Sequence, residues 1–76
     1  MAPVQEMSNA RQTLRAAHQV KAQRYAPELF GKAEHLLQAA EIQLAEGEYE
    51  QARASALAAR QEAIRARQRA LSQQRN

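Results

Sequence analysis

Two histidines, His18 and His35, are the first side chains to test for chemistry, because helical bundles can hold metals through paired histidine and glutamate. In di-iron bundles the glutamate precedes the histidine by three residues. At that spacing, Arg15 precedes His18 and Lys32 precedes His35. Glu34 is adjacent to His35, and adjacent helical residues point about 100° apart. The sequence therefore predicts no metal site at either histidine.

Nucleophiles and phosphate-binding loops are also missing from the sequence. The chain contains no cysteine and no aspartate, and its three serines lack a nucleophile-elbow sequence. No glycine-rich phosphate loop and no dinucleotide-binding fingerprint occur. We therefore expect no catalytic residue, no cofactor, no small-molecule substrate and no enzymatic activity.

Composition indicates long helices. The 76 residues are rich in Ala, Gln, Arg, Glu and Leu, with two glycines, two prolines and three aromatic residues. No apolar run approaches the roughly 18 residues that suggest a membrane span. An alanine-rich core of this size buries little apolar area, so support from oligomerisation or from a partner is expected.

Two breaks divide the chain into three predicted helices, which form one domain. Pro27 suits the first position of a helix, and Gly47 suits a helix C-terminus. The predicted helices cover about residues 4–24, 27–46 and 48–74. Because the joint at Gly47 is very short, the second and third helices should form an antiparallel hairpin. One unbroken helix through Gly47 is the alternative, at a cost of about 1 kcal/mol for the glycine.

Heptad-spaced seams favour the hairpin. The seam of the second helix consists of Ala26, Phe30, Ala33, Leu37, Ala40, Leu44 and Gly47, widened by Leu29 and Leu36. The seam of the third consists of Tyr49, Ala52, Ala56, Ala59, Ala63, Ala66 and Ala70. Large residues facing small ones allow close helix packing. The predicted fold is therefore all-α, with three helices centred on an antiparallel hairpin that has an alanine-rich seam.

Charged residues beside these seams suggest the hairpin register. Glu34 and Glu41 are seven residues apart on the second helix, as are Arg53 and Arg60 on the third. In an antiparallel pair, equivalent flanking positions meet on the same side. This predicts ion pairs between Glu41 and Arg53 and between Glu34 and Arg60.

A second apolar row on the third helix is unexplained by the hairpin. Leu57, Ile64 and Leu71 repeat every seven residues, away from the alanine seam. One interpretation is that the first helix covers them with Met7, Ala10, Leu14 and Ala17. The other is that the row is a surface for a protein partner or for a second copy of the chain.

Basic charge raises nucleic-acid binding as an alternative function. Six arginines against Glu62 give residues 51–76 a net charge of +5, and the sequence pI is about 10.0. However, the aromatic residues lie elsewhere in the chain, so no base-stacking platform is predicted. A small basic helical nucleic-acid binder is thus the alternative to an interaction module.

The stretches "ARQTLRAA" and "YAPELFGKAEHLLQAAEIQLAEGEYEQARASALAARQEAIRAR" carry a family resemblance. Their ordered elements are Tyr25 to Leu29, the turn at Gly47 to Tyr49, and the alanine ladder from Ala52 to Ala66. With these elements the chain resembles domain of unknown function 4398, a short helical domain of Gram-negative envelope proteins, and the resemblance covers nearly the whole chain.

That resemblance implies a location and a kind of role. Its members resemble exported proteins, often lipoproteins, and the family has no catalytic residues to transfer. It implies a periplasmic module held near the outer membrane in its parent protein, with structural or protein-interaction function. On this interpretation "APVQEMSNARQ" begins a mature chain from which a lipidated cysteine has been removed.

Overall fold

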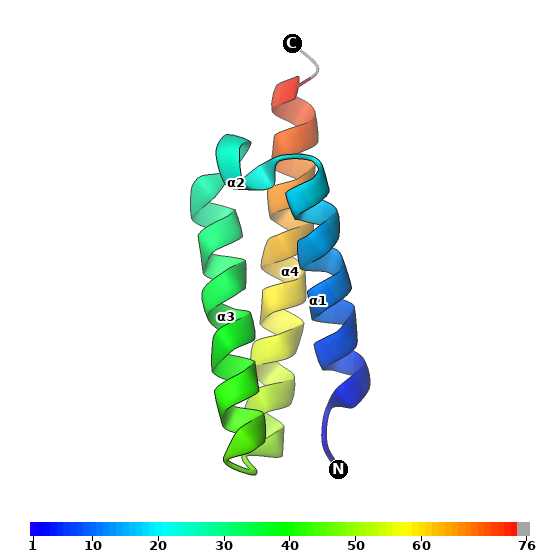
Figure 1. Cartoon of the computed structure of the whole chain (residues 1–76), viewed down its shortest axis with the longest axis vertical. Coiled ribbons are helices and arrows are strands. Elements are labelled where there is room, and N and C mark those ends of the chain that lie inside the picture. Colours follow the sequence, from blue (N-terminus) through cyan, green and yellow to red (C-terminus); the bar gives the residue numbers. More distant parts are fainter. Residues whose placement is uncertain (75–76) are drawn as a thin grey trace.

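The computed structural model describes residues 1–74 and contains only helices and their connections over that range. The helices are α1 (Val4–Gln19), α2 (Ala22–Tyr25), α3 (Pro27–Ala45) and α4 (Tyr49–Gln74). Figure 1 shows the three long helices side by side, with α3 antiparallel to α1 and α4 and with α2 crossing one end. The bundle measures 45 × 18 × 14 Å. The all-α fold predicted from the sequence is confirmed.

The first helix ends earlier than the predicted limit near residue 24. Lys21 has φ 63°, a left-handed conformation that glycine usually adopts at a helix end. The Lys21 N–H donates to His18 O at 3.0 Å, closing the last turn of α1. A lysine gives no stop signal, so periodicity alone predicted one helix through this break.

The short helix α2 accounts for the early break in packing terms. After Lys21 the chain makes one turn across the end of the bundle (Figure 1), which buries Ala22 completely and leaves Ala26 6% exposed. Both belong to one buried cluster that also includes Ala66 and Ala70. The connection from α1 to α3 therefore contributes to the core, which a two-residue joint at Tyr25 and Ala26 does not achieve.

The predicted helix start at Pro27 is confirmed. Ala26 has φ −141° and ψ 59°, outside the helical region, as expected for a residue before proline. The first helical hydrogen bond of α3 runs from the Phe30 N–H to Ala26 O at 3.0 Å. The proline ring thus occupies a position where its missing N–H breaks no helical bond.

The predicted hairpin turn at Gly47 is also confirmed. Gly47 has φ 78°, and its N–H donates to Leu44 O at 3.1 Å. The Glu48 N–H donates to Gln43 O at 2.8 Å. These two bonds form a Schellman motif, which satisfies carbonyl groups at the end of α3 and requires the left-handed conformation that glycine adopts without strain.

The core consists almost entirely of alanine. Apart from Pro3, Met7 and Phe30, its buried apolar side chains are Ala10, Ala17, Ala22, Ala26, Ala33, Ala40, Ala52, Ala56, Ala59, Ala63, Ala66 and Ala70. The predicted alanine seam of α4 is therefore buried from Ala52 to Ala70, whereas Tyr49 is 40% exposed. The most extensive helix contact joins α3 to α4, as expected for a bundle centred on the hairpin.

Helix α1 lies mainly against α4 and makes less contact with α3. Met7 packs with Ala40 of α3 and Ala56 of α4. Near the other end of α1, Ala17 packs with Phe30 and the C-terminal alanines of α4. The predicted contact row of the first helix is thus buried at Met7, Ala10 and Ala17, with Leu14 partly buried.

Candidate functional site

The second apolar row of α4, Leu57, Ile64 and Leu71, is called the stripe from here on. Leu57 is 48% exposed, and Ile64 and Leu71 are partly buried. None of the three belongs to either cluster of buried side chains. Helix α1 uses its apolar residues against the alanine core, so the interpretation in which α1 makes the stripe part of the core is wrong for Leu57. The stripe remains a candidate binding surface.

Arg53, Arg60 and Arg67 recur every seven residues beside the stripe, and the first of them contacts α1. The Arg53 Nε atom lies 3.3 Å from Glu6 Oε2, and its Nη2 atom donates to the carbonyl oxygen of Met1 at 3.4 Å. The predicted partner of Arg53, Glu41, instead lies 3.5 Å from Arg11 Nη2. The predicted pairing of Glu41 with Arg53 is therefore wrong. The prediction considered only two helices, and α1 supplies nearer partners to both residues.

The second predicted pair, Glu34 with Arg60, is also not formed among residues 1–74. Glu34 lines a groove of about 280 Å³ between α1 and α3, together with Arg11 and Arg15. Arg60 is exposed on α4. Within the described chain, Arg60 and the likewise exposed Arg67 form no ion pair, so both leave their charge available beside the stripe.

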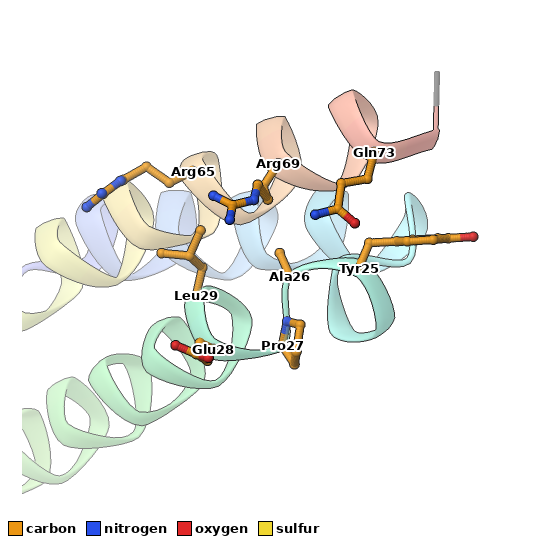
Figure 2. A pocket seen from close by; sticks show the side chains of 8 residues that line it. All are labelled: Tyr25, Ala26, Pro27, Glu28, Leu29, Arg65, Arg69 and Gln73. Carbon is orange, nitrogen blue, oxygen red and sulfur yellow. The ribbon is translucent and has the colours of Figure 1, made fainter. Parts of the chain in front are cut away.

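A cleft of about 320 Å³ lies where the α2–α3 joint faces the C-terminal half of α4. Its lining residues are Tyr25, Ala26, Pro27, Glu28, Leu29, Arg65, Arg69 and Gln73. Figure 2 shows the α4 residues on one wall, with Leu29, Ala26 and Tyr25 facing them. The Arg24 guanidinium stacks 5.4 Å from the centre of the Tyr25 ring. Sequence reasoning missed this cleft because it depends on how α2 turns.

The sequence profile of Domain of unknown function (DUF4398) matches residues 5–76, nearly the whole chain. The chain belongs to this family. In separate comparisons, no curated protein and no solved structure matches it. The three family elements noted in the sequence have structural roles in this DUF4398 chain: they form the joint lining the cleft, the Schellman turn and the buried face of α4.

One acidic residue of the DUF4398 chain is buried, and the sequence analysis did not single it out. Glu62 is 8% exposed on α4. Its Oε1 atom accepts from Arg65 Nη1 at 3.1 Å and lies 3.9 Å from Lys32 Nζ of α3. Its Oε2 atom has no hydrogen-bond partner among the described residues. A lone glutamate among six arginines, one residue before the seam residue Ala63, was the available signal.

The residues first considered for chemistry are dispersed in the structure. The ring centres of His18 and Phe30 lie 6.1 Å apart with their planes tilted by 42°, and His35 lines an open depression on α3. Ser55 Oγ is 2.8 Å from the Gln43 side chain across the hairpin. In the region from Met1 to Gln74, no three metal-ligating side chains cluster. None of the described helices combines the length and apolar character needed to cross a bilayer.

Proposed function

We propose that this chain is a non-enzymatic protein-interaction module of the Gram-negative cell envelope. In its parent protein it is held in the periplasm near the outer membrane, and it binds a helix of another envelope protein along the stripe. The observation that supports this proposal is the stripe itself. The bundle buries the alanine row of α4 and leaves the larger side chains of that helix outside the core.

A helix is the partner element that fits the stripe. Leu57, Ile64 and Leu71 recur every seven residues along an unbroken helix of 26 residues. A second helix with the same repeat would place one apolar side chain against each of them. The half-buried state of Ile64 and Leu71 means that part of the ordering cost is met before the partner binds.

The support for an envelope location is the resemblance noted in the sequence, which implies exported proteins and lipoproteins; the family match itself carries no information on location. An interaction role is also compatible with the small core. Alanine buries little apolar area, so contact with a partner would add stability that the isolated bundle lacks.

Photo-cross-linking in Gram-negative cells tests the proposal. A photoreactive amino acid replaces Leu57 in the full parent protein, and a matched variant carries it at Ile42 of α3. Ile42 is 59% exposed and therefore controls for an accessible apolar position. We expect a discrete adduct from position 57, which mass spectrometry identifies as one envelope protein and which Ile64→Asp abolishes. Equal adducts from both positions, or none from position 57, would contradict the docking role.

Fractionation of the same cells tests the location separately. After the outer membrane is made permeable, external protease should degrade the parent protein while a cytoplasmic control protein survives. Survival of the parent protein together with that control would exclude a periplasmic location.

A further inference from the structure

The stripe has a basic border on one side and a neutral border on the other. Arg60 and Arg67 precede Ile64 and Leu71 by four residues each, so they lie along the same side of the apolar row. The opposite border has uncharged Gln61 and Gln68, which follow Leu57 and Ile64 by four residues. The surface is therefore electrostatically asymmetric across its width.

The arginines of α4 differ in whether they form ion pairs within the bundle. Arg53 is half-buried against Glu6 of α1, and Arg65, on the side facing α3, is paired with Glu62. Arg60 and Arg67 are exposed and take part in no ion pair within residues 1–74. The bundle thus leaves unpaired the two cations that lie directly along the proposed docking surface.

We infer that the segment binding the stripe is an acidic amphipathic helix of another protein. This inference rests on the proposed docking function. The partner helix has an apolar row that contacts Leu57, Ile64 and Leu71, and a row of glutamates or aspartates that meets Arg60 and Arg67. In helix pairing, the apolar row supplies most of the affinity, while the flanking charges select the partner and its orientation.

A second copy of this chain fits the surface less well. In an antiparallel pairing of two α4 helices, each arginine border would meet the same border of the other copy. In a parallel pairing, each arginine border would meet the glutamine border of the other copy, where Arg60 and Arg67 find no carboxylate. Like charges placed across an interface suppress association. The same charges attract an acidic helix.

Two synthetic helical peptides of about three heptads serve as probes. Both have leucine at the core positions, which match the seven-residue period of the stripe. One has glutamate at the flanking positions and the other has lysine. Fluorescence anisotropy measures the binding of each peptide to the whole 76-residue chain. We expect the glutamate peptide to bind at least about tenfold more tightly, and added salt to reduce this preference.

Two charge-matched double variants show which arginines cause the preference for the glutamate peptide. Arg60→Glu combined with Arg67→Glu should remove or reverse the preference for the glutamate peptide. Arg15→Glu combined with Arg69→Glu changes the net charge equally at exposed positions away from the stripe and should retain it. Circular dichroism verifies that both variants keep their helix content. If the first variant unfolds, Arg60→Gln with Arg67→Gln replaces it and should abolish the preference.

The outcomes separate this inference from the proposed function. Equal binding of the two peptides, or tighter binding of the lysine peptide, overturns the acidic partner and leaves docking on the stripe intact. A dimer in sedimentation that Leu57→Asp dissolves identifies a second copy as the occupant and also overturns it. Binding of neither peptide overturns it as well, and cross-linking from position 57 then decides separately whether the stripe docks a protein.

Discussion

Helix α4 has two heptad rows that differ in size and in environment. The inward row, from Ala52 to Ala70, consists of alanines exposed by 2% or less. The stripe, which consists of leucine and isoleucine, lies outside both core clusters, and Leu57 is 48% exposed. Small side chains allow α1 and α3 to approach α4 closely. Large side chains on the outside leave apolar area for contact with another molecule.

This difference indicates that the larger apolar side chains of α4 are not the more buried ones in this bundle. In most cores the larger apolar residues contribute most of the burial energy. Here the close approach of three helices excludes them from the centre of the contact, except for Met7 and Phe30. Substitutions on the two faces of α4 should therefore have opposite tolerances to side-chain size.

The largest effect is expected when the inward row is enlarged. Ala63 is fully buried, so Ala63→Leu inserts three carbon atoms into a site that is closed to solvent. We expect a loss of about 1–3 kcal/mol in the free energy of unfolding, measured by urea denaturation. A matched substitution, Leu57→Ala, removes the same atoms from an exposed site and should change stability by less than about 0.5 kcal/mol. If Ala63→Leu is neutral, the inward row is less tightly packed than described.

A smaller loss of stability is expected at Ile64, the stripe residue next to Ala63. Ile64 is partly buried, so Ile64→Ala should cost about 1 kcal/mol, below the roughly 2–5 kcal/mol typical of a fully buried isoleucine. Thermal unfolding measures the cost, and sedimentation follows the oligomeric state. A cost above about 2 kcal/mol in a protein that stays monomeric would mean that α1 covers this position after all.

The sequence predicted the parts of the fold that depend on local chemistry. Proline at the start of α3, glycine in the turn and the alanine period all have local physical causes, and each was placed correctly. The break at Lys21 was missed because it depends on tertiary packing of Ala22 and Ala26 and not on the lysine itself.

The candidate site was only partly predictable for the same reason. The stripe was visible as a seven-residue repeat, but its exposure depends on where α1 packs. The ion pairs were assigned wrongly because the heptad positions define a side of each helix and cannot show that a third helix intervenes. Glu6 and Arg11, both on α1, take the places that the two-helix argument gave to Glu41 and Arg53.

Double-mutant cycles on these ion pairs should give coupling energies smaller than the stability losses expected for the two core-facing and stripe substitutions. Glu6 and Arg53 are each about one-third exposed, so their coupling should be about 0.2–1 kcal/mol in thermal unfolding. A cycle of the same design on Glu34 and Arg60 should give no coupling. Measurable coupling in the second cycle, with none in the first, would restore the register predicted from the two-helix argument.

The smallest expected effect is the binding of nucleic acid, which tests whether the arginines beside the stripe have a special role in it. We expect only weak binding without sequence preference, and the logarithm of the binding constant should fall steeply with the logarithm of salt concentration. Arg60→Glu with Arg67→Glu and Arg15→Glu with Arg69→Glu should weaken it equally, because no stacking platform localises the contact. Tight, sequence-selective binding at physiological salt would favour the nucleic-acid alternative.

The odd number of long helices has a mechanical consequence. The chain enters α1 at one end of the 45 Å long axis and leaves α4 at the other, because α1 and α4 run in the same direction (Figure 1). Tension between segments attached before α1 and after α4 therefore acts along the helices and loads their mutual contact in shear. Under such tension, many contacts between α1 and α4 bear the load at the same time. In a two-helix hairpin, whose two ends lie together, the same tension would break the helix contacts one after another.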